Sequence, residues 1–235
     1  MGTHRPIGGR IIFSLWIIKV THLIKCSFSY PDMGDQQRGL DSAETLFSKH
    51  GGMLRASEAV ALGIHPRTLY RLRDENRLVA ITRGLYRLAD LPELSDPDLV
   101  SVATRVSQAV ICLISALAFH EITTEIPHEV SIALPRTVKR PRLDHPPLRV
   151  FWFSGESLTE GIEEHKIDGV KVRVYGPEKT VGDCFKFRNK IGLDVAIEAL
   201  KLCRERKGAT PRKLLHYARI CRVERIMRPY LEALG

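Results

Sequence analysis

The chain has 235 residues, of which 44% are hydrophobic and 27% are charged. This composition is typical of a globular protein with one large or two small domains, and it excludes a mainly disordered chain. Lysine and arginine outnumber aspartate and glutamate by 36 to 27, which gives a formal net charge of +9. Such a basic balance favours a polyanionic partner, either nucleic acid or a membrane surface.

The cysteines indicate neither disulfides nor a metal site. Their number is odd and no C-x-x-C pair occurs, so the sequence lacks the spacing of a zinc or thioredoxin motif. We expect free thiols in a reducing cytosol, most of them packed as small apolar side chains. They are Cys26, Cys112, Cys184, Cys203 and Cys221.

The N-terminal 40 residues form an extension of different character. Ile11 to Cys26 is strongly apolar, but Lys19 and His22 interrupt it. It is also shorter than the roughly 20 apolar residues of a spanning helix. We therefore expect no membrane segment. Our hypothesis is that residues 1–32 come from a mis-assigned upstream start, and that the folded protein begins near Met33.

The positions of glycine and proline in residues 41–92 predict where three helices begin and end. Glycine ends a helix and proline opens one without losing a hydrogen bond, and the second and third helices are separated by a short glycine turn. This is the helix-turn-helix pattern. The helices are expected at Asp41 or Ser42 to about His50, at about Ala56 to Leu62, and at Pro66 to about Asn76, with a short extended bridge at Met53-Leu54.

A β-hairpin is expected directly after the third helix. Two short apolar runs, Leu78–Ile81 and Leu85–Leu88, flank a turn at Thr82-Arg83-Gly84. A hairpin in this position is the wing of a winged helix-turn-helix. Arg83 at its tip is then placed for a phosphate or the minor groove.

The third helix has the faces of a recognition helix. Leu69, Leu72 and the stem of Arg73 are expected on the core side, and Tyr70 with two arginines on the other. Arginine can bond two acceptors on a guanine edge or grip a phosphate. The alternative is a small helical subdomain with a solvated basic face. The DNA-binding candidates are Arg67, Thr68, Tyr70, Arg71, Arg73, Arg77 and Arg83.

One residue departs from the pattern. Arg55 stands where the second helix would prefer serine or threonine, and its side chain cannot accept hydrogen bonds from the first turn.

Residues 93–235 predict a larger domain of mixed α+β type, separated from the first near Pro92. Its most apolar run, Gln108 to Phe119, is expected to be buried as a helix or as a strand and a helix. Strands are expected at Val130–Leu134, Leu148–Phe153 and Val170–Val174, and helices at Leu99–Val106, from Pro177, at Leu193–Arg206, Pro211–Ile220 and Glu224–Leu234.

Two parts of this domain are strongly basic. Residues 136–142 form a loop that is either solvated or in contact with DNA backbone. Residues 183–228 carry thirteen lysines and arginines against five acids. Amphipathic helices place their charged side chains on one face. The alternative to a binding surface at residues 183–228 is therefore a solvent-exposed helix face without a partner.

No catalytic signature emerges, and no cofactor or metal is expected. Gly176 to Thr180 (GPEKT) lacks the upstream glycines of a phosphate-binding loop and is interpreted as the start of a helix. The histidines lack metal-ligand spacing. A nuclease remains an alternative, because Glu164 with Lys166, or Asp168 with Lys171, resembles an acid-x-lysine element.

The order of motifs resembles the AbiEi family, the antitoxins of type IV toxin–antitoxin (abortive infection) systems. Gly63-Ile64, Thr68-Leu69-Tyr70, Leu72 and the Arg83–Tyr86 wing match the N-terminal domain of that family. The strand leading into Pro177–Thr180, with Asp183 after it, and the ending Arg228–Leu231 resemble its C-terminal domain. The resemblance covers about residues 41–235 and leaves residues 1–40 unmatched.

The resemblance implies a bacterial or archaeal cytosolic protein that binds double-stranded operator DNA and represses its own operon. It further implies a nucleotidyltransferase toxin, encoded nearby, which the C-terminal domain (93–235) counters without a stable complex. Basic side chains of that domain are then candidates for the antitoxin activity: Lys186, Lys201, Arg204, Lys207 and Lys213. The alternative to an antitoxin is a stand-alone winged-helix regulator whose second domain binds a small molecule or mediates assembly.

Overall fold

The computed structural model describes residues 33–234, which divide into two units, one ending at Ala43 and one beginning at Glu44. The expected division near Pro92 lies within the second unit and stays a prediction, so smaller domain and larger domain are only names for residues 41–92 and 93–234. Helix α1 (Met33–Lys49) starts eight residues before the expected cap at Asp41, because the polar segment before that cap has no proline to stop a helix. The apolar stretch at residues 11–26 and the hypothesis of a later start lie outside the described residues. Within residues 33–234 no helix is long and apolar enough to cross a membrane.

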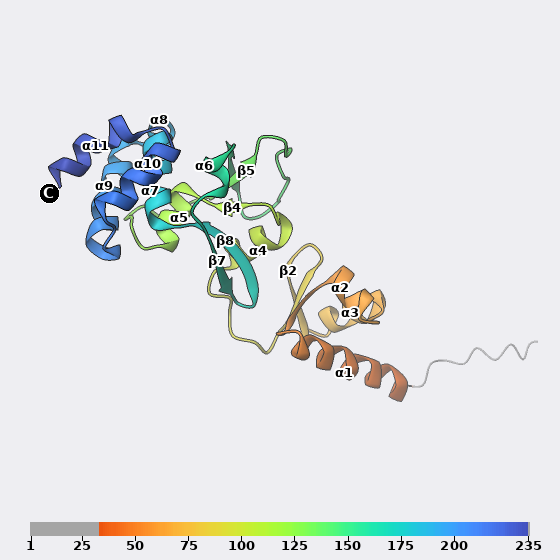
Figure 1. The fold of residues 1–235 in the computed structure, drawn as a ribbon. Helices are drawn as coiled ribbons and strands as arrows, with labels where there is room; N and C mark the ends of the chain where they lie inside the picture. The colour runs from red at the N-terminus through yellow and green to blue at the C-terminus, as the bar shows by residue number, and fades with distance from the viewer. Residues whose placement is uncertain (1–32, 235) are drawn as a thin grey trace, which may run out of the picture. The chain divides into compact units, whose positions relative to one another are not determined.

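The next elements occur in the order expected for a winged helix-turn-helix (Figure 1). A three-stranded antiparallel sheet has the order β1-β3-β2, so the hairpin strand β3 pairs with both of the others. The two short helices α2 and α3 precede the hairpin in the chain. The bounds are β1 (Met53–Arg55), α2 (Ala56–Ala61), α3 (Pro66–Asp74), β2 (Leu78–Thr82) and β3 (Leu85–Leu88).

The turn between α2 and α3 is built as its sequence predicts. Gly63 has a φ of +90°, a conformation that other residues rarely adopt. Pro66 opens α3, and the His65 side chain accepts a hydrogen bond from the Arg67 backbone N–H. Leu69 and Leu72 are buried, so α3 is fixed with its remaining face outward.

The first turn of α2 is capped in an unusual way. Arg55 makes no side-chain cap, as expected for arginine, but its backbone N–H donates to the Glu58 carboxylate at 2.9 Å. The guanidinium is directed elsewhere and donates to the Thr104 carbonyl. Glu58 thus supplies half of a capping box, and the Arg55 guanidinium serves the contact with Thr104 instead.

A mixed five-stranded sheet of order β6-β5-β4-β8-β7 forms the centre of the larger domain. The β5–β6 and β4–β8 pairs are parallel, and the β4–β5 and β7–β8 pairs are antiparallel. The strands are β4 (Val110–Ile111), β5 (Val130–Pro135), β6 (Leu148–Phe153), β7 (Ile162–Ile167) and β8 (Val170–Tyr175).

Helices gather mainly on one side of this sheet, where α7 packs against α5, α9, α10 and α11 (Figure 1). A large apolar core fills this layer, and a smaller core lies under α4 on the other side. The helices are α4 (Pro97–Arg105), α5 (Leu113–Phe119), α6 (Glu156–Thr159), α7 (Pro177–Lys186), α8 (Arg188–Ile191), α9 (Leu193–Lys207), α10 (Pro211–Ile220) and α11 (Glu224–Ala233).

The apolar run at residues 108–119 is a strand and a helix, β4 and α5, and most of it is buried as expected. Three elements were not predicted: β7, α6 and α8. β7 reads IEEHKI, which lacks a clean apolar alternation because it is an edge strand with charged side chains in water. The two helices have only four residues each, too few for a periodic signal.

A buried ion pair joins the first two turns of α7. Lys179 and Asp183 are both 0% exposed, and the Lys179 Nζ lies 2.5 Å from the Asp183 Oδ2. Cys221 of the α10–α11 turn donates its Sγ–H to the other carboxylate oxygen at 3.1 Å. Burial raises the pKa of Asp183, and the Lys179 ammonium opposes this effect.

The aromatic residues of the sheet complete the surroundings of this pair. The Lys179 ammonium lies 4.0 Å from the ring centroid of Tyr175 and 5.1 Å from that of Phe153. Gly161 passes so close that an added Cβ would lie 2.7 Å from the Lys179 Cβ. The Pro-Glu-Lys-Thr segment and Asp183 therefore connect the sheet to the helical layer.

Breaking this pair should destabilise the protein strongly. We expect Asp183→Ala or Lys179→Met alone to lower the free energy of unfolding by about 3–5 kcal/mol, because each leaves an unpaired charge in the core. The double variant Lys179→Met/Asp183→Leu should lose much less than the sum of the single effects. Urea denaturation of all three variants measures this coupling, and additive losses would contradict it.

Candidate nucleic-acid interface

The outward face of α3 carries polar side chains that contact solvent. Tyr70 is 51% exposed, and Arg67 is exposed beside the helix N-terminus. Arg67 makes no ion pair with any residue that the structure describes. Thr68 is half-buried between them. This face therefore offers a cation and an aromatic ring near the start of the helix.

Two further arginines on α3 have acidic neighbours. The Arg71 Nε donates to Glu75 at 2.8 Å, and Arg73 donates twice to Asp74, at 3.0 and 2.7 Å. The Arg73 guanidinium also lies 5.4 Å from the Tyr70 ring centroid. Its stem was expected on the core side with the leucines, but the side chain is exposed, and its guanidinium lies beside Tyr70 and Asp74.

Arg77 has a different environment from the other candidates. Its guanidinium binds the Glu44 carboxylate in a two-pronged contact at 2.5 and 2.6 Å, and its side chain is 25% exposed. The two partners join the end of α1 to the residues after α3. This geometry favours a role in holding the domain together over the expected contact with a phosphate.

The wing tip presents a second exposed cation. Arg83 lies in the turn between β2 and β3, and Gly84 beside it has a φ of +77°. The Arg83 side chain is exposed and forms no ion pair within the described part of the chain. Its carbonyl oxygen accepts a hydrogen bond from the Arg105 guanidinium at 3.0 Å, which fixes the turn from the side of α4.

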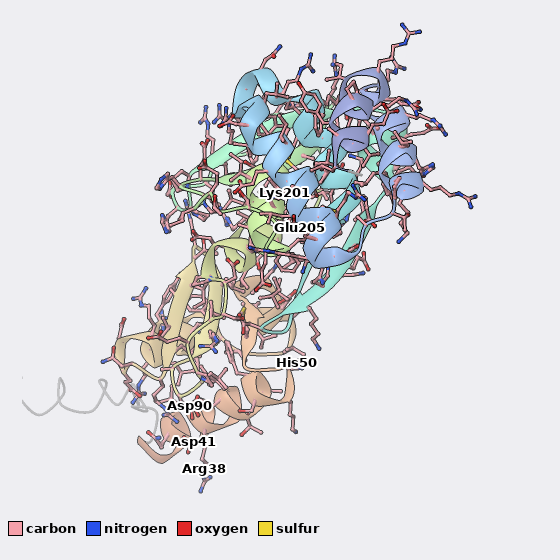
Figure 2. All side chains as sticks on the ribbon, turned by 90° about the vertical axis from the view of Figure 1, so that its left-hand side faces the viewer. Arg38, Asp41, His50, Asp90, Lys201 and Glu205 are labelled. Carbon is pink, nitrogen blue, oxygen red and sulfur yellow. The ribbon has the colours of Figure 1, made fainter. Side chains whose placement is uncertain are left out.

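The basic candidates of the larger domain do not form one cluster. Lys201 and Arg204 on α9 line a hollow of ≈ 390 Å³ together with Glu205, Thr210 and other residues of the α9–α10 turn. Figure 2 shows Lys201 and Glu205 one turn apart on α9. The remaining three candidates do not line that hollow. Lys207 is exposed at the end of α9, and the Lys213 Nζ lies 3.5 Å from the Glu178 carboxylate. Lys186 packs over the Phe153 ring and donates a hydrogen bond to Ser157.

The residues considered for a nuclease are engaged in local contacts. Asp168 accepts hydrogen bonds from the backbone N–H and hydroxyl of Ser95, at 2.9 and 2.8 Å. Glu164 forms an ion pair with Lys171 at 2.6 Å across the β7–β8 hairpin. Among residues 33–234, no group of three or more histidine, cysteine, aspartate or glutamate side chains is arranged to hold a metal ion.

The cysteines within the described range are buried free thiols: Cys112, Cys184, Cys203 and Cys221. Burial raises the pKa of each, so none is poised as a reactive thiolate.

Comparison with known proteins bears on both domains. The chain is similar to the crystal structure of the RV2827C protein from Mycobacterium tuberculosis, with a TM-score of 0.58 and 16% sequence identity over 83% of this chain and 76% of that one. At this identity the likeness shows a shared fold. No curated protein matches the chain.

A family model gives the more specific result. Residues 41–89, which include α2, α3 and the hairpin, match the model described as "Transcriptional regulator, AbiEi antitoxin". The resemblance that we drew from the glycine turn, the third helix and the wing is thereby confirmed for this segment. Residues 41–89 are thus similar to the AbiEi antitoxins and transcriptional regulators.

Proposed function

We propose that this protein is a DNA-binding autorepressor that acts as the antitoxin of a type IV toxin–antitoxin system in a bacterial or archaeal cytosol. The observation that carries the proposal is the exposed, basic face of α3 and the wing tip, within a segment that matches the AbiEi regulators. Double-stranded operator DNA is the expected ligand. The sequence motifs and the fold support this reading together.

The contacts of the arginines suggest which of them bind base edges and which bind phosphates. Arg67 lies at the N-terminal end of α3 without an ion-pair partner among the described residues, which suits a contact with a base edge. Arg71 can exchange Glu75 for a base, since both side chains are partly exposed. Arg73 and Arg83 suit phosphates, which position the protein without reading sequence.

The larger domain is proposed to carry the antitoxin activity against a nucleotidyltransferase toxin, through its basic surface and without a stable complex. Lys201 and Arg204, which share one hollow, are the strongest candidates on that surface. The same hollow favours one alternative, a regulator that binds a small anionic ligand there. An assay of cell protection from the toxin separates the two functions, because a regulator that only binds a small ligand is not expected to protect cells.

The first test concerns the division between base and phosphate contacts. We expect Arg67→Ala or Arg71→Ala to weaken binding to the DNA upstream of the protein's own gene by about 1–3 kcal/mol, with reduced discrimination against random DNA. Arg83→Ala should weaken binding to both DNAs and reduce the salt dependence by about one unit. Fluorescence anisotropy at several salt concentrations measures both effects.

Arg225→Ala is a matched control, because Arg225 is exposed on α11 and lies outside the reading segment. It should bind both DNAs as the parent protein does. If Arg67→Ala and Arg71→Ala also leave affinity and discrimination unchanged, α3 does not read the operator and the proposal fails.

The second test separates repression from protection. The variant Arg67→Ala/Arg71→Ala should lose repression of a reporter but still protect cells from a neighbouring nucleotidyltransferase when expressed from a foreign promoter. Lys201→Ala/Arg204→Ala should retain repression but lose protection, because the two substituted cations lie in the larger domain. Circular dichroism of each variant verifies folding. Loss of protection by a folded Arg67→Ala/Arg71→Ala variant would show that the two activities are one.

A further inference from the structure

Strand β6 forms one outer edge of the five-stranded sheet, and within residues 33–234 no strand pairs with its other side. The ladder with β5 fixes which backbone groups point outward. Val130 donates to the Pro147 carbonyl at 2.8 Å and lies opposite Leu148. Because successive residues of a strand alternate, the backbone groups of Leu148, Val150 and Trp152 point away from β5.

A hollow of ≈ 460 Å³ lies along this edge. Pockets for small organic molecules have volumes of roughly 300–1,000 Å³, so the hollow has room for a nucleotide. It is lined by aromatic and basic side chains and by no acidic one: Arg136, Val150, Phe151, Trp152, Phe187 and Lys190.

Trp152 is the unusual member of this set. Its side chain belongs to a strand whose neighbours Phe151 and Phe153 are buried, yet Trp152 is 42% exposed. The indole N–H donates to the Val138 carbonyl at 3.4 Å, which fixes the ring on the loop that follows β5. An aromatic ring that is held in place and open to solvent is a surface on which a base can stack.

The charges around the ring are those that a phosphate backbone requires. Arg136 and Lys190 line the hollow, and neither forms an ion pair with a residue that the structure describes. The adjoining loop adds three exposed cations, Lys139, Arg140 and Arg142. Glu129, directly before the neighbouring strand, is 3.5 Å from Arg149 and is thus paired, and Asp144 follows the three cations of the loop.

We propose that the edge of β6 binds single-stranded nucleic acid, with one base stacked on Trp152 and the flanking phosphates on Arg136, Lys190 and the loop at residues 139–142. The inference concerns a different surface from α3 and the wing, and it holds whether or not the operator proposal holds.

An extended acidic peptide is the competing occupant, since it could add a strand to the open edge. The Arg140 guanidinium already binds the outward carbonyl of Leu148 at 3.0 Å. Only Val150 and Trp152 then offer outward groups, which is too short a stretch for a stable added strand. The exposed indole and the spread of cations along the loop favour nucleic acid.

The test measures binding of the full chain to a labelled oligothymidylate of roughly 12 nucleotides, a length within the site sizes of single-strand binders. Trp152→Ala should weaken binding about tenfold or more, and Trp152→Phe should retain most of it, because the stacking surface persists. Arg136→Ala/Lys190→Ala should reduce the salt slope by about 1.4 units.

Two controls separate this surface from the reading segment. The Arg67→Ala/Arg71→Ala variant should bind the oligothymidylate as the parent does, and Arg225→Ala should be unchanged. An equal length of duplex DNA and a polyglutamate peptide serve as competitors, and both should compete poorly against the single strand.

Three results would overturn the inference. The first is unchanged affinity in a folded Trp152→Ala variant. The second is equal competition by duplex DNA, which would assign the edge to double-stranded DNA. The third is equal competition by polyglutamate, which would assign it to acidic peptides.

Discussion

The contact between Lys179 and Asp183 is the constraint on which the larger domain depends. Both side chains are fully buried, and their contact at 2.5 Å offsets part of the cost of removing two polar groups from water. The pair lies where the sheet meets the helical layer, with Tyr175 beneath it and Cys221 bonded to it from the α10–α11 turn. The Pro-Glu-Lys-Thr segment and the aspartate after it therefore have a structural role, whereas the proposed binding residues are exposed basic side chains elsewhere in the chain.

Acidic neighbours decide which arginines of the smaller domain are available. Arg77 and Glu44 join two elements in a part-buried contact, so this guanidinium stabilises the domain. Arg71 and Arg73 rest on acids that are themselves exposed, and such pairs are worth little in water. A phosphate can therefore replace those acids at small cost. Arg67 and Arg83 have no such ion-pair partner among the described residues, so a proposed contact with nucleic acid there requires no acid to be displaced.

The protein thus offers basic surfaces of different chemistry. The α3 helix and the wing present cations with one tyrosine, in the segment that matches the AbiEi family model. The hollow on α9 mixes cations with a glutamate, and the edge of β6 combines cations with a fixed indole. These differences of composition predict different ligands, since a stacked base needs an aromatic face and a duplex backbone does not.

The sequence by itself determined the helix, glycine turn, helix and hairpin of residues 56–88, because Gly63, Pro66 and Gly84 impose local backbone conformations. It also determined where several long helices of the larger domain begin, since proline opens α4, α7 and α10. It did not reveal β7, whose charged side chains are stabilised by pairing with β8, nor the ion pairing of Arg77 with Glu44, 33 residues away. Tertiary structure alone decided that Lys179 is buried while Trp152 is exposed, because burial depends on elements that pack from distant parts of the chain.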